Sequence, residues 1–266
     1  MPGMRQIHRR AAAITTLALL ASAPAAARGG KPAAPEIVVY AAASLRDVLE
    51  EIAPRGEEAA GALLVFNFGA SNDLARQIEA GNKADVLFSA DESSMDEVAR
   101  AGLVELGSRR SLLSNRLVVV TPKDTPPDIR SPRDLLGPGV RRVALADPRA
   151  VPAGKYARAW LERAGLWSGL EDRILPGLDV RAALASVESG GAEAGVVYRT
   201  DAAISTRVRI VYEVPESEGP SICYPVAALR DRPRLDVARR VVDWLAGPEA
   251  AAGFARHGFI VRDRGR

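Results

Sequence analysis

The sequence is poor in the residues that form disulfides, metal centres and aromatic cores. Of its 266 residues, one is cysteine, two are histidine and 5% are aromatic. The lone Cys223 excludes an intramolecular disulfide, and too few histidines and cysteines remain for the usual zinc site. With 47% hydrophobic and 26% charged residues, the composition is that of a globular protein whose core consists mainly of Ala, Leu, Val and Ile.

Motifs of common enzymes are missing as well. The chain contains no G-x-S-x-G segment and no Walker A loop, and its histidines, His8 and His257, lie near the two ends. We therefore expect that the protein is not an enzyme. A secreted hydrolase is the alternative that these absences disfavour.

The chain has no excess of charge once its first residues are set apart. The formal net charge is +3, and residues 1–27 contain Arg5, Arg9 and Arg10 but no acidic residue. The remainder has 33 basic and 33 acidic residues. Nucleic-acid binding needs clustered positive charge, so we expect no nucleic-acid partner.

Residues 1–27 have the pattern of a secretory signal peptide. The three arginines precede an apolar run from Ala11 to Ala23, and small residues follow at Ala25-Ala26-Ala27. This run is shorter than the roughly 20 residues of a membrane-spanning helix. We expect export to the periplasm, with a flexible segment at 28–35. The pair Arg9-Arg10 leaves twin-arginine export open as the route.

From residue 36, β-branched runs alternate with helical stretches. Strands are expected at 36–40, 63–66, 85–88, 117–121, 143–146, 195–198, 208–211 and 224–229. Helices are expected at 45–60, 73–80, 94–101, 155–164, 180–189, 235–245 and 249–256, with a short one from 131. This alternation predicts an α/β protein with parallel sheets covered by helices. Two doubly wound lobes fit the series better than one sheet.

Three turns after expected strands, at 42–45, 69–72 and 151–154, carry small or hydroxyl residues where a helix begins, and a fourth turn, at 178–181, opens a further helix. Helix N-termini present unpaired N–H groups and partial positive charge, and ligands of α/β sheets bind at the carboxyl ends of strands. Together the turns indicate an anion site about as strongly as a purely structural role. The alternative, that Ser44 and Ser71 only cap their helices, stays open.

Several blocks of sequence carry a family resemblance. They are Tyr40–Leu45, Gly69–Gly81, Ala84–Asp91, Asp147–Gly154, Asp179–Arg181, Gly195–Tyr198, Tyr224–Val226 and Gly247–Phe259. Their order resembles that of the periplasmic molybdate-binding proteins of ABC importers, over nearly the whole chain after the leader.

The resemblance implies a type II periplasmic-binding-protein fold, in which two doubly wound α/β lobes enclose the ligand in an interlobe cleft. Crossover segments are expected near Val118–Thr121 and Cys223–Val226. Lobe 1 then comprises 36–117 and 226–266, and lobe 2 comprises 118–225. A monomer is expected, because lobe closure alone completes the site.

By the same resemblance, two serines, two backbone amides and a tyrosine hydroxyl hold a tetrahedral oxyanion. Carried over by motif, these are Ser44 and Ser71 from lobe 1, and the amides of Ala153 and Val180 with the hydroxyl of Tyr198 from lobe 2. No side chain ligates the metal directly, since molybdenum is bound as its oxyanion, and no cofactor is expected.

The chemistry of the ligand agrees with such a site. Molybdate and tungstate are dianions that only accept hydrogen bonds, whereas monohydrogen phosphate carries a proton that needs an acceptor. Each hydrogen bond to a charged group contributes roughly 1.5–3 kcal/mol. Five such contacts suffice for the roughly 8 kcal/mol of micromolar binding after association costs. Sulfate is also an acceptor-only dianion, so it stays an alternative that only pocket size would separate.

Charged neighbours of these residues are expected to stay outside the pocket. A buried counter-ion is expensive to desolvate, so Lys155 and Arg181 are expected to be solvated surface charges. Asp73, in the first turn of its helix, is expected to point away from the dianion.

The function implied is high-affinity extracytoplasmic binding of molybdate, and of tungstate, for delivery to an inner-membrane ABC permease. A receptor for sulfate or another tetrahedral oxyanion is the alternative. The effector-binding half of a transcription regulator shares this fold, but the leader peptide and the missing helix-turn-helix domain argue against it.

Overall fold

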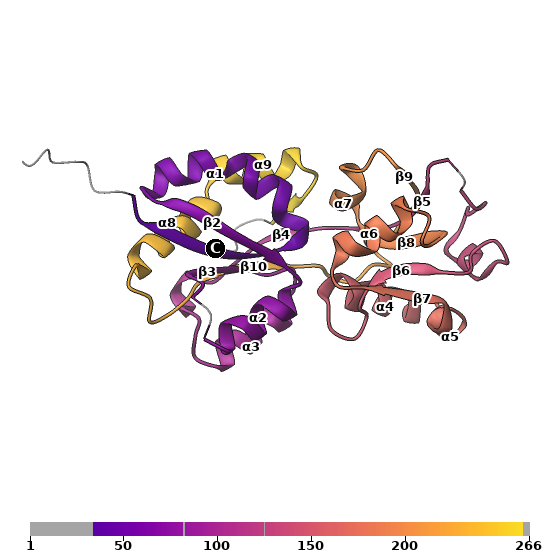
Figure 1. Ribbon diagram of the computed structural model, residues 1–266, viewed down its shortest axis with the longest axis horizontal. Coiled ribbons are helices and arrows are strands. Elements are labelled where there is room, and N and C mark those ends of the chain that lie inside the picture. The colour runs from indigo at the N-terminus through magenta and orange to yellow at the C-terminus, as the bar shows by residue number, and fades with distance from the viewer. Residues whose placement is uncertain (1–33, 82, 125, 263–266) are drawn as a thin grey trace, which may run out of the picture. The chain divides into compact units, whose positions relative to one another are not determined.

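A computed structural model describes residues 34–262, apart from 82 and 125, as an α/β architecture with two mixed sheets (Figure 1). The predicted signal peptide, 1–27, and most of the predicted flexible segment, 28–35, lie outside the described residues. Within the described part of the chain, no helix has the length and apolar character needed to cross a membrane.

The first sheet has the strand order β11-β4-β10-β3-β1-β2. Its strands are β1 (Glu36–Ala42), β2 (Leu63–Gly69), β3 (Val86–Phe88), β4 (Arg110–Ser114), β10 (Tyr224–Ala228) and β11 (Ile260–Val261). β1 is parallel to β2 and β3, whereas β10 is antiparallel to β3 and β4, and β11 to β4. In Figure 1, α1, α8 and α9 cover one face and α2 and α3 the other. Their bounds are α1 (Arg46–Ala60), α2 (Ser71–Glu79), α3 (Glu92–Arg100), α8 (Leu235–Leu245) and α9 (Pro248–Arg256).

The second sheet has the order β7-β6-β8-β5-β9. Its strands are β5 (Leu117–Pro122), β6 (Val143–Ala146), β7 (Ile174–Gly177), β8 (Ala194–Tyr198) and β9 (Val208–Glu213). β6 is parallel to β7 and β8, and β5 is antiparallel to β8 and β9. Both α4 and α6 contact β6 and β8. The helices here are α4 (Pro152–Arg163), α5 (Trp167–Leu170), α6 (Val180–Glu188) and α7 (Arg199–Ala203).

Short 3-10 helices complete the described elements. They are η1 (Ala43–Leu45), η2 (Leu106–Ser108), η3 (Pro132–Leu136) and η4 (Glu171–Arg173). The short helix expected from residue 131 is therefore a 3-10 helix. It begins with Ser131 as N-cap and Pro132 in its first turn.

The chain passes between the sheets at 115–116, from β4 to β5, and at 214–223, from β9 to β10. Residues 118–121, expected as a crossover, instead lie in β5, where Val118 pairs with both Val197 and Glu213. A run of buried β-branched residues suits a central strand better than a link. The predicted lobe bounds differ from sheet membership at Leu117, which joins the second sheet, and at Tyr224 and Pro225, which join the first.

Both sheets are mixed rather than parallel as expected. In the first sheet, the antiparallel strand β10 is added beside the parallel set β2-β1-β3. In the second sheet, the antiparallel strand β5 is added beside the parallel set β7-β6-β8. Among the strands that the sequence did not indicate, β4 alternates polar with apolar residues only weakly, and β7 contains Pro176. Proline is tolerated there because β7 is an edge strand.

The core consists mainly of small aliphatic side chains, as expected from the low aromatic content. Val118, Val119 and Val120 are completely buried in β5, which lies between β8 and β9 in the second sheet. Trp160 is the largest of the fully buried side chains. This aliphatic core fixes the carboxyl ends of β1, β2, β6, β7 and β8, near which the predicted site residues lie.

Candidate binding site

All five predicted site residues, Ser44, Ser71, Ala153, Val180 and Tyr198, line one pocket between the two sheets. The pocket is small, with a cavity volume of about 10 Å³. The other lining residues are Ala42, Ala43, Gly69, Ala70, Ala90, Val151, Pro152 and Asp179. The four turns indicated by the sequence thus meet at one place.

The two serines of the first lobe are buried and do not cap helices. Ser44 lies in η1 directly after β1, and Ser71 is the first residue of α2. Ala42 and Ala70 occupy the N-cap positions of η1 and α2, and neither helix has a side-chain cap. The capping alternative is therefore wrong for both serines, and their hydroxyls are left for other partners.

Each serine oxygen has a neighbour from which it can accept a hydrogen bond, so the hydrogen of the serine hydroxyl remains available for donation. The backbone N–H of Ala90 donates to Ser71 Oγ over 2.9 Å. Ser44 Oγ lies 3.2 Å from the Tyr224 hydroxyl, which in turn accepts from Asn115 Nδ2 at 3.3 Å. With that bond accepted, the Tyr224 hydrogen is free for Ser44 Oγ. Both serines can then donate into the pocket.

The second lobe contributes the N-termini of α4 and α6. Ala153 lies in the first turn of α4, and Val180 is the first residue of α6. Backbone N–H groups in a first turn have no intrahelical partner and carry partial positive charge. α4 begins at Pro152, earlier than the predicted Lys155, because proline is well tolerated in a first turn.

Gly154 sets the position of the α4 N-terminus. A Cβ atom at this residue would lie 2.1 Å from the carbonyl oxygen of Ala146 and 2.6 Å from that of Asp147. Only glycine allows the helix to approach the end of β6 so closely. The approach brings the Ala153 amide to the carboxyl edge of the sheet.

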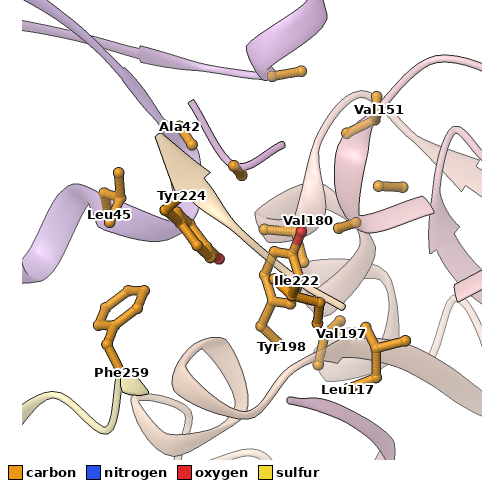
Figure 2. Close-up of a cluster of buried hydrophobic side chains, with 14 of the residues drawn as sticks. Ala42, Leu45, Leu117, Val151, Val180, Val197, Tyr198, Ile222, Tyr224 and Phe259 are labelled. Carbon is orange, nitrogen blue, oxygen red and sulfur yellow. The ribbon is translucent and has the colours of Figure 1, made fainter. Parts of the chain in front are cut away.

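Tyr198 ends β8 with a polar atom that has no hydrogen-bond partner among the described residues. The side chain is 1% exposed, and its hydroxyl is buried. Burial raises the pKa of Tyr198 well above its ordinary value, so the hydroxyl stays a neutral donor. Figure 2 shows the ring beside that of Tyr224, with centroids 5.9 Å apart. A buried donor without a partner points to a missing acceptor in the pocket.

Two carboxylates lie close to the site in sequence. Asp73, as expected, is turned away: it pairs with Arg76 and does not line the pocket. Asp179 does line it, which departs from the expectation of donors only. Its Oδ1 accepts the N–H of Ala182 at 2.9 Å, so the carboxylate serves as the N-cap of α6.

The expectation that Lys155 and Arg181 are solvated surface charges is wrong. Arg181 is 23% exposed and pairs with Asp201 and Asp47. Lys155 is 35% exposed and pairs with Asp91. Both basic side chains contact carboxylates, and the attraction between the opposite charges offsets the cost of removing each cation from water.

Sequence reasoning missed the hydroxyl network behind Ser44. Tyr224 belongs to a block quoted for the resemblance, but nothing local indicated its bond to Ser44. Asn115 donates to both Tyr224 and Thr200 Oγ1 from the first crossover. These contacts join segments that are far apart in the chain, which local patterns do not reveal.

The sequence matches the family of bacterial extracellular solute-binding proteins over residues 37–260. The chain belongs to this family. Membership makes it a binding protein and not an enzyme, as the sequence predicted. Among the described residues, no group of three or more His, Cys, Asp or Glu side chains is arranged to hold a metal ion.

Several relatives carry a more specific name. The molybdate-binding protein ModA of Escherichia coli is 40% identical over 85% of this chain and 90% of its own length. ModA of Haemophilus influenzae is 32% identical over 86% of this chain and 92% of its own.

Solved structures agree with the fold. The periplasmic molybdate-binding protein of Azotobacter vinelandii superposes with a TM-score of 0.76 at 25% identity, covering 85% of this chain and all of that one. The sulfate-binding protein SubI of Mycobacterium tuberculosis gives the same TM-score at 19% identity, over 86% of this chain and 88% of that one. At that identity the second likeness concerns the fold alone.

Proposed function

We propose that this solute-binding protein captures molybdate, and tungstate with it, in the pocket between the two sheets. The names of its relatives supply the ligand class, and the donor chemistry of the pocket suits it. Hydroxyls of Ser44, Ser71 and Tyr198 and the amides of Ala153 and Val180 offer hydrogens to an anion that only accepts them. No resident cofactor is needed.

The buried hydroxyl of Tyr198 is the observation that carries this proposal. It is fully desolvated and unpartnered among the described residues, at a cost of about 1–3 kcal/mol if nothing bound there. An oxyanion oxygen would accept this hydrogen. The same oxyanion would meet the free N–H groups at the N-termini of α4 and α6.

The further steps of transport belong to the same proposal. Residues 1–27 would direct the chain to the periplasm, where the loaded monomer would deliver its ligand to an inner-membrane ABC permease. The balance of 33 basic and 33 acidic residues after the leader supports a small-molecule partner over nucleic acid.

Isothermal titration calorimetry of the mature protein tests the ligand directly. Molybdate, tungstate, sulfate and phosphate are titrated separately at neutral pH. We expect micromolar or tighter binding of molybdate and tungstate, and at least tenfold weaker binding of sulfate. Equal affinity for sulfate would change the function to general oxyanion uptake. Absence of binding by every anion would refute the proposed ligand class.

A further inference from the structure

Two ion pairs cross from one lobe to the other beside the pocket. In each, the cation belongs to the second lobe and follows closely on a residue that lines the pocket: Arg181 comes directly after Val180, and Lys155 comes two residues after Ala153. The carboxylates belong to the first lobe, Asp47 in α1 and Asp91 just before α3.

The first pair is anchored on the second lobe by a buried acid. Arg181 Nη2 lies 2.5 Å from Asp47 Oδ2, and Arg181 Nε lies 2.5 Å from Oδ1 of Asp201. Asp201, in α7, is completely buried. Because Asp201 and Arg181 share a lobe, their contact does not depend on the other lobe. The contact with Asp47 exists only while the lobes are together.

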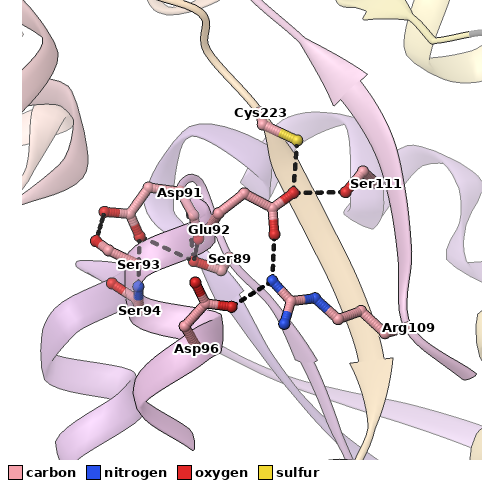
Figure 3. Close-up of polar contacts among 9 residues, drawn as sticks. All are labelled: Ser89, Asp91, Glu92, Ser93, Ser94, Asp96, Arg109, Ser111 and Cys223. Atoms are coloured by element: carbon pink, nitrogen blue, oxygen red, sulfur yellow. Dashed lines mark hydrogen bonds and ion pairs between the residues drawn. The ribbon is translucent and has the colours of Figure 1, made fainter. Parts of the chain in front are cut away.

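The second pair is anchored on the first lobe. Asp91 is the N-cap of α3, accepting from Ser94 N at 3.1 Å and from Ser93 Oγ at 2.7 Å (Figure 3). Lys155 Nζ extends from α4 to within 3.5 Å of Asp91 Oδ2 and 3.2 Å of Ser93 Oγ. Asp91 is 7% exposed on its side chain, so the cation approaches a largely desolvated carboxylate.

We propose that Asp47–Arg181 and Asp91–Lys155 are two latches that hold the lobes together over the bound anion and slow its release. The inference rests on the proposed function, and it assigns to these four residues a role in positioning and retention rather than direct contact with the ligand. None of the four lines the pocket. One member of each latch, Arg181 or Asp91, keeps its contacts within its own lobe when the lobes separate. Only the contact that crosses between the lobes is lost, so each latch stabilises the closed arrangement and not the separate lobes.

The effect of the latches comes from the difference between the cleft with its lobes apart and the cleft with its lobes closed over the ligand. With the lobes apart, Asp47 and Lys155 are hydrated and gain nothing from their partners. Closure brings each charge to a partner that is less exposed, Arg181 at 23% and Asp91 at 7%, where the attraction is stronger than in bulk water. Interactions made after encounter change dissociation more than association, so the latches should govern koff.

Release of radiolabelled molybdate from the loaded protein into excess unlabelled molybdate measures koff. Asp47→Asn removes the carboxylate charge of the first latch, and Lys155→Gln removes the cation of the second. We expect each variant to release the anion about 3- to 10-fold faster with kon within about twofold of wild type. The pairs share no residue, so the double variant should multiply the two effects.

Matched controls carry the same chemical changes on the same helices. Glu50→Gln alters an α1 carboxylate whose partner, Arg46, is on its own helix, 3.4 Å away. Arg158→Gln alters an α4 cation paired with Glu162 on that helix. Both controls should release molybdate at the wild-type rate. The melting temperature of each latch variant without ligand should stay within about 2 °C of wild type.

The outcomes separate the latch from the binding function. Tight binding by wild type, with unchanged koff in Asp47→Asn and Lys155→Gln, would overturn the latches and leave the ligand assignment intact. Faster release together with a lower ligand-free melting temperature would assign the pairs to fold stability and also overturn them. A wild-type protein that does not bind molybdate would overturn the proposed function and the latches with it.

Discussion

Single hydroxyl groups decide whether the pocket suits an anion. Tyr198 and Ser44 come from different lobes, and each is placed by backbone structure rather than by a neighbouring charge. Ser44 is supported by Tyr224, which is supported by Asn115. Such a chain of hydrogen bonds orients a donor without the cost of burying a counter-ion.

Removal of the Tyr198 hydroxyl should weaken binding and leave the fold intact. Tyr198→Phe deletes one hydrogen bond to a charged ligand, worth roughly 1.5–3 kcal/mol, so Kd should rise about 10- to 100-fold. Calorimetric titration with molybdate measures the change. Tyr212→Phe, which removes a hydroxyl bonded to Glu218 outside the pocket, is the control and should bind like wild type. Wild-type affinity in Tyr198→Phe would contradict its assigned role.

Asp201 should make stability depend on pH. Burial raises its pKa to about 7, against a lowering influence from Arg181. The folded protein therefore keeps a proton that the unfolded chain releases, so this group's stabilising contribution is full below about pH 4 and is lost as pH rises through about 7. Asp201→Asn lacks this loss. Relative to wild type, its free energy of unfolding should rise on the order of 3 kcal/mol between about pH 5 and pH 8.

Urea denaturation at each pH measures this difference. Asp128→Asn, at an exposed carboxylate paired with Arg130, serves as the comparison and should follow the wild-type profile. A difference between Asp201→Asn and wild type that is constant over the whole pH range would show that Asp201 does not titrate as inferred.

At the scale of elements, the start of α4 does most to shape the second half of the pocket. Pro152 begins the helix, Ala153 offers its amide, and Gly154 permits contact with the carbonyls at the end of β6. The order of these three residues therefore fixes both the direction and the depth of the helix N-terminus. A change of one methyl group here is expected to move the amide.

Gly154→Ala should damage both stability and binding. The added Cβ would collide with backbone oxygens that cannot rotate away, so α4 must shift outward. We expect a loss of about 1–3 kcal/mol in unfolding free energy and at least tenfold weaker molybdate binding. Gly139→Ala is the control, since its Cβ would meet only Pro127 Cβ at 3.7 Å. Equal behaviour of the two variants in denaturation and titration would refute the close-approach argument.

At the scale of the whole molecule, two sheets with separate strand orders share one ligand. The chain crosses between them at 115–116 and 214–223. Asn115, in the first crossover, donates to Tyr224 on one side and to Thr200 on the other. A ligand that contacts both lobes adds a further connection and should stabilise the whole fold.

Molybdate should therefore raise the melting temperature with its concentration. Binding to the native state alone adds about 4 kcal/mol at a ligand concentration of about 1,000 Kd. For a domain pair of this size, that corresponds to an increase of about 8–16 °C. Differential scanning fluorimetry over a molybdate series measures it. A shift that does not grow with concentration would be incompatible with binding to the native state.

The sequence by itself determined the α/β alternation, the aliphatic core and the turns that form the pocket. These features depend on local patterns: β-branched runs, helix starts, and small residues between a strand and a helix. The set Ser44, Ser71, Ala153, Val180 and Tyr198 came from the resemblance to the molybdate-binding family, carried over by motif, and the structure brings these residues together around one pocket. Their contacts with the ligand stay a prediction.

Tertiary structure alone decided the antiparallel strands, the places of the crossovers and the charged pairs around the pocket. Asp47 and Arg181 are 134 residues apart, and Asp91 and Lys155 are 64 apart. No local pattern distinguishes a lysine on a solvated helix face from one that reaches across a cleft. Whether a strand is parallel or antiparallel to its neighbour likewise depends on which distant segment pairs with it at the edge of the sheet. Such pairings are set by the packing of whole elements, because their free energy is realised only after the lobes have formed.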